Sequence, residues 1–185
     1  RPPSVYGYTD TPDAPLTLED AAVCAEGVGL ARTFTVADAF TIAGVEVGLR
    51  LAHPYRSDLS ARLTAPSGAQ ATLFAFDRNV LAANVNALFT DAGAALLANE
   101  LADHSLQGAF VATVYRPVDR LAAFAGQEAA GTWTLTLCDR DPVNDAGAFE
   151  AAELHFTALT PPLTIRSDWA YSEDAGSSDG VTYSR

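Results

Sequence analysis

The chain has 185 residues, of which 49% are hydrophobic and 18% are charged. This length and composition are typical of one globular domain with a core of its own. Asp and Glu outnumber Lys and Arg by 23 to 11, and the formal charge of −12 argues against nucleic acid, whose phosphates it would repel. No apolar run approaches the ~20 residues that cross a bilayer, so we expect no membrane span.

Residues 1–30 are rich in turn-forming residues, with prolines at positions 2, 3, 12 and 15. Such a stretch disfavours a helix and predicts an extended N-terminal arm. The alternation of apolar and polar residues begins further on. It is regular over 45–51 and again over 59–65, and a turn at 66–68 precedes another short strand at 71–76.

Residues 79–105 lack clean alternation, which predicts long loops with a short helix near 94–101. Alternation returns over 131–138, where Trp133, Leu135 and Leu137 share one face and Cys138 lies on the other. After an acidic loop, a last strand runs to about Leu159. Many short strands with long irregular connections predict an all-β sandwich of jelly-roll or Greek-key type over 31–159, followed by a C-terminal tail at 160–185.

The two arms contain five aromatic residues. Fixing the backbone of one residue costs ~1–2 kcal/mol, so ordered arms need burial or strand pairing. One aromatic side chain can bury ~150–250 Å² when it finds a groove. We expect the arms to be anchored on the same chain or on a neighbouring copy by Tyr6, Tyr8, Trp169, Tyr171 and Tyr183.

The two cysteines, Cys24 and Cys138, lack the spacing of a metal site or a redox motif. Taken alone, the residues leave two alternatives open, a single structural disulfide and two buried free thiols.

Acidic and amide side chains crowd the loop that follows the strand at 131–138, at Asp139, Asp141, Asn144 and Asp145. Repulsion between like charges disfavours such a loop unless a cation or an arginine neutralises it. The spacing is not that of an EF-hand, because Pro142 intrudes and the flanks are strands. A looser calcium site and a solvated acidic turn are the two alternatives.

We expect no catalysis from this chain. Residues 176–180 match the pattern Gly-x-Ser-x-Gly around Ser178, but a nucleophile elbow needs an apolar strand before it and a helix after it, and neither pattern is present. His53, His104 and His155 are scattered without zinc-binding spacing. The simplest role for His53 is to anchor its strand end by hydrogen bonds to the Asp58 loop.

The first half of the chain resembles a known family. In that family a strand ends in His, a turn contains Asp-Leu, and a second strand ends in Ser-Pro-x-Gly. The matching segments here are His53–Leu59 and Leu63–Gly68. Ser57 stands where Gly is usual, and Ala65 stands where Ser is usual.

The second half continues the resemblance. Residues 131–135 are similar to the Gly-Thr-Trp-x-Leu strand, Asp139 to the acidic residue that closes it, 145–147 to an Asp-x-Gly turn, and 153–156 to the final strand. Segments 89–92 and 121–126 resemble the middle motifs of bacterial members. Over about 31–159 the chain therefore resembles the P domain, or Homo B domain, which follows the catalytic domain of subtilisin-like proprotein convertases.

The resemblance implies a secreted, non-catalytic β-sandwich whose partner is a protease catalytic domain. It also implies structural calcium (Ca²⁺), held where Asp58, Asp91 and Asp139 meet the loop that contains Asp141 and Asp145. A secreted context favours the Cys24–Cys138 disulfide, with the segment bearing Cys24 crossing the outside of the sheet.

Two alternatives to this accessory role remain. The chain is an extracellular structural subunit whose arms dock onto copies of itself, or it is a lectin-like sandwich, an idea that rests on architecture alone.

Overall fold

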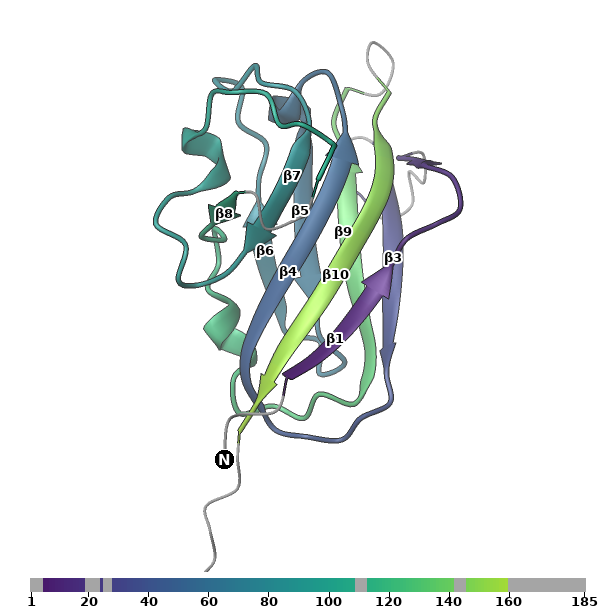
Figure 1. Cartoon of the computed structure of the whole chain (residues 1–185), viewed down its shortest axis with the longest axis vertical. Helices are drawn as coiled ribbons and strands as arrows, with labels where there is room; N and C mark the ends of the chain where they lie inside the picture. Colours follow the sequence, from purple (N-terminus) through teal and green to yellow (C-terminus); the bar gives the residue numbers. More distant parts are fainter. Residues whose placement is uncertain (1–4, 19–23, 25–27, 109–112, 142–145, 160–185) are drawn as a thin grey trace, which may run out of the picture.

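The computed structural model describes residues 5–18, 24, 28–108, 113–141 and 146–159, and in these ranges the regular secondary structure consists of β-strands and a few short 3₁₀ turns (Figure 1). The strands are β1 (Val5–Asp10), β2 (Leu16–Thr17), β3 (Val28–Val36), β4 (Ile42–Ala52), β5 (Leu59–Thr64), β6 (Gln70–Phe74), β7 (Val85–Phe89), β8 (Val114–Tyr115), β9 (Gly131–Asp139) and β10 (Ala148–Ala158). Single 3₁₀ turns lie at Arg56–Asp58 (η1), Leu97–Asn99 (η2) and Leu121–Phe124 (η4).

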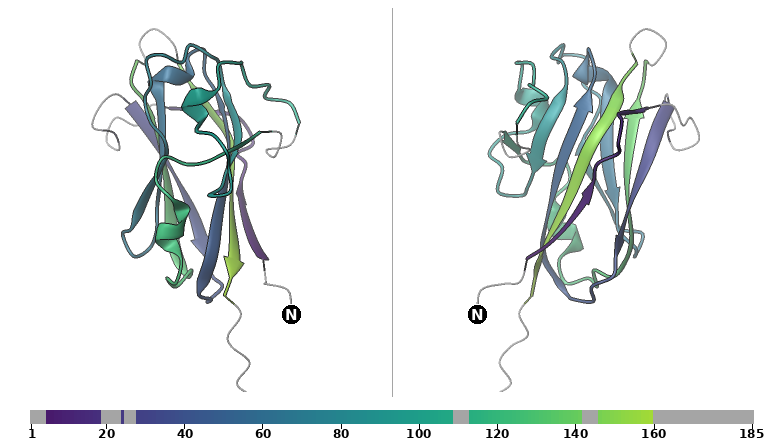
Figure 2. Two further views of the ribbon diagram at one scale, coloured as in Figure 1. Left: turned by 90° about the vertical axis from the view of Figure 1, so that its left-hand side faces the viewer. Right: turned by 45° about the vertical axis from the view of Figure 1, so that its right-hand side comes forward.

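The strands form two facing sheets, which Figure 2 shows from the side. One has the order β1-β10-β4-β7-β8, with β2 also paired to β10, and the other has the order β3-β9-β5-β6. The chain crosses between the sheets from β3 to β4, from β4 to β5 and from β9 to β10, so sequence neighbours often lie in different layers. The predicted all-β sandwich of jelly-roll or Greek-key type is confirmed.

The core lies between the sheets and is centred on Trp133, which has no exposed surface. The ring of Trp133 makes edge contacts with Phe124 at 5.1 Å and with Phe156 at 5.0 Å between centroids. Its indole N–H donates to the carbonyl of Ala129 at 2.9 Å, so the buried polar group is satisfied. The outward residues of the same strand are Thr132, Thr134, Thr136 and Cys138, as the alternation predicts.

Two of the sequence motifs meet at a glycine. Gly131 has φ +131°, and a Cβ atom built there would lie 2.7 Å from the Cβ of Pro66. No side chain fits in that space, and the backbone conformation also favours glycine. Close packing of the Gly-Thr-Trp strand against the turn after β5 therefore requires glycine at position 131.

The N-terminal arm is extended and pairs with its own chain. β1 runs antiparallel to β10, with Tyr6 opposite Phe156 and Tyr8 opposite Leu154. The ring of Tyr6 stacks on Phe40 at 4.1 Å, and Tyr8 meets the edge of Phe156 at 6.0 Å. The arm thus becomes the edge strand of one sheet (Figure 1). The C-terminal tail and its aromatic residues (Trp169, Tyr171, Tyr183) lie outside the described residues.

The segment 79–105 contains a strand where the sequence pattern predicts loops. Residues 85–89 form β7, paired with β4 on one side and β8 on the other. Four of its five residues are buried, including Asn86, so both faces are covered and the polar alternation that marks a half-exposed strand is lost. The short helix expected near 94–101 is the single turn η2.

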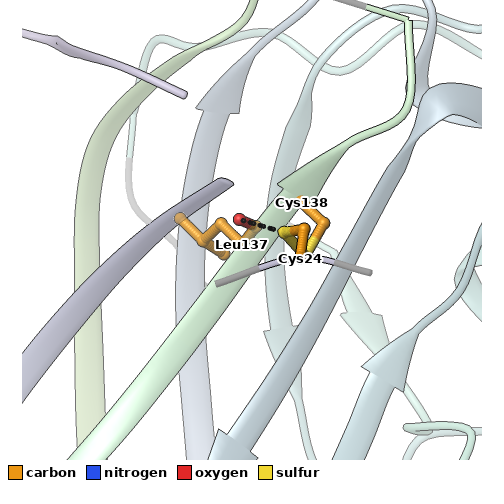
Figure 3. Close-up of a disulfide and its surroundings, with 3 residues drawn as sticks. All are labelled: Cys24, Leu137 and Cys138. Atoms are coloured by element: carbon orange, nitrogen blue, oxygen red, sulfur yellow. Dashed lines mark hydrogen bonds between the residues drawn. A yellow bond between two sulfur atoms is a disulfide. The ribbon is translucent and has the colours of Figure 1, made fainter. Parts of the chain in front are cut away.

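The disulfide joins Cys24 and Cys138, as predicted. Cys138 points outward from β9, and Cys24 lies over the outer face of the same strand (Figure 3). The Sγ of Cys24 is 3.6 Å from the carbonyl oxygen of Leu137, a contact that is not a hydrogen bond because an oxidised sulfur carries no proton. The bond therefore attaches Cys24 to a central strand of this sheet.

Removing the disulfide should destabilise the domain without changing its fold. The bridge spans a sequence separation of 114 residues. For a loop of that length the chain-entropy model gives an upper figure of about 4–5 kcal/mol. We expect the double variant Cys24→Ser, Cys138→Ser to lose about 2–4 kcal/mol of unfolding free energy in urea titrations, with no further effect of reductant. Alkylation of both thiols in the native protein without reductant would contradict the bridge.

Candidate functional site

The motif residues His53 and Asp139 meet at one end of the sandwich. His53 follows the last residue of β4, Asp139 is the last residue of β9, and these two strands belong to different sheets. Nε2 of His53 lies 3.2 Å from Oδ2 of Asp139, and neither side chain has exposed surface. The pair therefore ties the two sheets together inside the core.

The hydrogen bonds around the pair define its protonation. The main-chain N–H of Tyr55 donates to Nδ1 of His53 at 3.0 Å, so Nδ1 carries no proton and Nε2 donates to Asp139. The other carboxylate oxygen of Asp139 accepts the N–H of Asp141 at 3.0 Å. His53 thus anchors its strand end to the start of the Asp58 loop and to Asp139. Both ring nitrogens are engaged, so His53 is not placed to activate a nucleophile.

Gly147 completes this end of the sandwich. A Cβ atom built on Gly147 would lie 2.6 Å from Cδ2 of His53 and 2.9 Å from Cδ1 of Leu18. Only glycine allows the chain to pass so close to the imidazole before it enters β10.

Asp58 lies at the same end and is neutralised by an arginine. Its Oδ1 accepts a hydrogen bond from Arg140 at 2.7 Å, and its carbonyl accepts the main-chain N–H of Arg140 at 2.8 Å. The Arg140 guanidinium also lies 5.1 Å from the centroid of the Phe76 ring. Asp58 is thus neutralised by Arg140, the residue that follows Asp139.

Asp91 does not join this group. β7 runs antiparallel to β4, from Val85 beside Leu51 to Phe89 beside Val47, so it leads away from His53. The two carboxylate oxygens of Asp91 accept the N–H groups of Leu121 and Ala122 at 2.9 and 2.8 Å, next to η4. η4 packs by the first residues of β4, whose eleven residues extend about 35 Å. The structure therefore separates Asp91 from the other residues of the calcium ligand set that the resemblance implies.

The remaining acidic residues do not complete a site within the described part of the chain. Asp141 is exposed, and Asp145 lies outside the described residues. Among the residues that the structure describes, no three or more His, Cys, Asp or Glu side chains gather in a group that could hold a metal ion.

A second polar cluster, missed by the sequence analysis, adjoins His53. The side-chain carbonyl of Asn84 accepts the N–H of His53 at 3.0 Å, and its amide donates to the carbonyl of His104 at 3.1 Å. The guanidinium of Arg56 donates to the carbonyls of Asn84 and Glu100 at 3.0 and 2.7 Å. Asn84 has φ +61°, a conformation that asparagine tolerates better than most residues. The presence of an asparagine at position 84 is the sequence feature that agrees with this conformation.

His104 is the titratable member of the cluster. Its Nδ1 accepts the N–H of Asn86 at 3.0 Å, so Nε2 carries the proton and donates to the hydroxyl of Tyr115 at 2.8 Å. Burial, together with the positive charge of Arg56, lowers the pKa of His104 from 6.5 to about 4.

This depressed pKa predicts a pH dependence of stability. Above about pH 6.5 His104 is neutral in both the folded and the unfolded chain, so its full contribution to the free energy of unfolding is present. As the pH falls from 6.5 towards 4, His104 binds a proton in the unfolded chain but stays neutral in the folded chain. The free energy of unfolding should then fall by at most about 1.4 kcal/mol per pH unit, and by less because the surrounding groups are partly solvated.

Urea titrations of the native protein and of His104→Gln between pH 7.5 and 4.5 measure this effect. The stability advantage of the native protein over the variant should shrink below pH 6.5. An advantage that stays constant across the range would show that His104 titrates normally.

Within the described part of the chain, no helix has the length and the apolar character that crossing a bilayer requires. A comparison with curated proteins finds no match.

Solved structures that share the fold include two from Aeromonas sobria. The serine protease of Aeromonas sobria in complex with its chaperone aligns with a TM-score of 0.51 at 18% identity, over 85% of this chain and 27% of that one. The structure of the serine protease of Aeromonas sobria aligns with a TM-score of 0.50 at 18% identity, over 84% of this chain and 26% of that one. The chain thus spans about a quarter of the length of these proteins.

Residues 42–156, more than half of the chain, match the Proprotein convertase P-domain family. This range begins with β4 and ends within β10, and it includes His53, Gly131, Asp139 and Gly147. The chain therefore belongs to the proprotein convertase P-domain family.

Proposed function

We propose that this chain is an extracellular, non-catalytic accessory module that packs beside a protease catalytic domain and stabilises it. The observation that carries the proposal is the family match over 42–156, since the P domain is a non-catalytic accessory domain of proteases. The Cys24–Cys138 disulfide supports an oxidising, extracellular location.

The chemistry of the motif residues agrees with an architectural role. A catalytic histidine needs one ring nitrogen available to the reacting group. In His53 one nitrogen accepts the Tyr55 amide and the other donates to the buried Asp139. Gly131 and Gly147 are explained by close packing. These residues hold a rigid sandwich that presents its surface to a partner.

The alternative is an assembly in which both arms dock onto neighbouring copies. For the N-terminal arm this docking has less support. Tyr6 and Tyr8 already pack against Phe40 and Phe156 of the same chain, so they are not available to a neighbouring copy. Docking of the C-terminal tail onto a second copy stays a prediction.

Co-production with the subtilisin-like catalytic domains of the source organism tests the accessory role. One of them should elute with this chain in size-exclusion chromatography and should keep its activity for longer at raised temperature. The isolated chain should not be labelled by a fluorophosphonate. The proposal fails if no catalytic domain associates with the chain or gains stability, or if Ser178 is labelled.

We also propose that a calcium ion binds at the His53 end, with fewer ligands than the resemblance implies. These ligands are Asp141 and residues of the acidic loop that follows it in the sequence. The support is the exposure of Asp141 and the crowding of Asp141 and Asp145 in the sequence. Asp91 is excluded by its position, and Asp139 by its complete burial. Asp58 can contribute only by leaving Arg140.

Thermal unfolding with calcium and with a chelator tests this site. An ion that binds only the folded state stabilises it by ~2.7 kcal/mol at a hundredfold excess over Kd. The melting temperature should rise with calcium in the native chain and much less in Asp141→Asn. Asp38→Asn is the matched control, because Asp38 is a surface carboxylate bonded to Tyr8, and it should keep the full rise. Identical curves with calcium and chelator would show that Arg140 and His53 alone compensate the carboxylates.

A further inference from the structure

A small hollow lies beside the polar cluster, between η1, the stretch 74–80 and η2. Its walls include the buried side chains of Phe74, Val80 and Leu97. The volume of the hollow is about 10 Å³. The centre of one water molecule needs ~10–15 Å³, whereas sites for organic ligands have ~300–1,000 Å³. The hollow therefore has room for a single water molecule and for nothing larger.

Arg56 lines this hollow and is the buried cation of the polar cluster, with 3% of its surface exposed. Its Nη1 donates to the carbonyl of Asn84, and its Nη2 donates to the carbonyls of Glu100 and Ala102. Within the described residues, the buried Nε of Arg56 has no hydrogen-bond partner. An unsatisfied buried donor on a charged group is costly, so we expect Nε to have a partner in the hollow.

Asp77 supplies a second polar group to the lining. Its Oδ1 accepts the main-chain N–H and the side-chain amide of Asn79, both at 3.0 Å. A carboxylate has about four acceptor positions, so Asp77 keeps the capacity to accept another hydrogen bond. Ser57 is a buried residue of the lining, and its hydroxyl can donate or accept. Ala75 is exposed beside Asp77, so the hollow opens to solvent on this side.

The charges of the lining narrow the class of ligand. The carboxylate of Asp77 repels an anion, and the guanidinium of Arg56 repels a cation. A fitting ligand is neutral, accepts from the Nε–H of Arg56 and donates to an oxygen of the lining. Water does both, and a buried water typically makes about three hydrogen bonds to protein groups.

We propose that one ordered water molecule occupies this hollow, accepting a hydrogen bond from Nε of Arg56 and donating one to the carboxylate of Asp77. The water completes the hydrogen bonding of the guanidinium that joins η1 to the segments at Asn84 and Glu100. The inference goes beyond the accessory role proposed above. It assigns a hydration site that stabilises this end of the sandwich whether or not a partner protein is bound.

Water–protein NMR on the full chain, labelled with ¹⁵N at arginine, tests the site directly. The Nε–H of Arg56 should show a dipolar cross-peak to water with the sign of a long-lived bound molecule. The Nε–H of Arg120 is the control, because Arg120 is exposed beside η4. It should show only chemical exchange with solvent, whose cross-peak has the opposite sign in the rotating frame. The proposal is overturned if the Nε–H of Arg56 gives no dipolar peak or behaves as that of Arg120.

Val80→Ile tests whether the water lies in this hollow. Val80 lines the hollow, and isoleucine adds one methyl group, which competes with the water for the same space. The cross-peak should vanish, and the equilibrium constant for unfolding should rise about tenfold because Nε loses its partner. A cross-peak that survives in Val80→Ile overturns the site, and any loss of stability is then overpacking of the core. Loss of the cross-peak with unchanged stability overturns the stabilising role of the water.

Val118→Ile is the matched control variant. Val118 is 51% exposed and does not line the hollow, so the same added methyl group should leave both the cross-peak and the stability unchanged. Loss of the cross-peak in Val118→Ile as well would also overturn the site. The isolated chain is the only protein used, so failure here is distinct from failure of the accessory role.

Discussion

The carboxylate of Asp139 has no exposed surface, and a buried charge without partners would cost several kcal/mol. The chain satisfies it with the imidazole of His53 and the main-chain N–H of Asp141. Since His53 ends a strand of one sheet and Asp139 ends a strand of the other, this bond couples the two layers. It also explains why Gly147 must lack a side chain. The geometry of this end of the sandwich depends on that one buried pair.

The N-terminal segment closes the sandwich in two further ways. β1 extends one sheet along β10, and Asp10 at its end forms a two-bonded ion pair with Arg32 of β3, at 2.6 and 2.7 Å. Arg32 also lies over the ring of Phe149 in β10 at 5.3 Å, so this side chain of one sheet contacts the other sheet. Further along, the disulfide holds Cys24 over the outer face of the other sheet. The N-terminal part of the chain is therefore attached to both sheets.

Each carboxylate of the acidic end has a different environment, although the residues look alike in sequence. Asp58 faces Arg140, Asp139 faces His53, and Asp141 is exposed. A neutralising group is needed only where solvent is excluded, because water screens an exposed charge. The guanidinium of Arg140 thus compensates the half-buried Asp58, and a hydrogen bond from Nε2 of His53 satisfies the buried Asp139. The same reasoning separates Asp91, whose charge is met by backbone N–H groups at η4.

The sequence by itself determined the strands with one buried face, β4, β5, β9 and β10, because a period of two follows directly from the geometry of a half-exposed strand. The parity of β9 also placed Cys138 on the outer face, whereas its disulfide with Cys24 was expected from the secreted context that the family resemblance implies. Only the tertiary structure decided the rest. β7 is covered on both faces and shows no period, and its direction carries Asp91 away from Asp139. Contacts between loops, such as those of Asn84, depend on which strand ends meet, and that follows from packing rather than from local pattern.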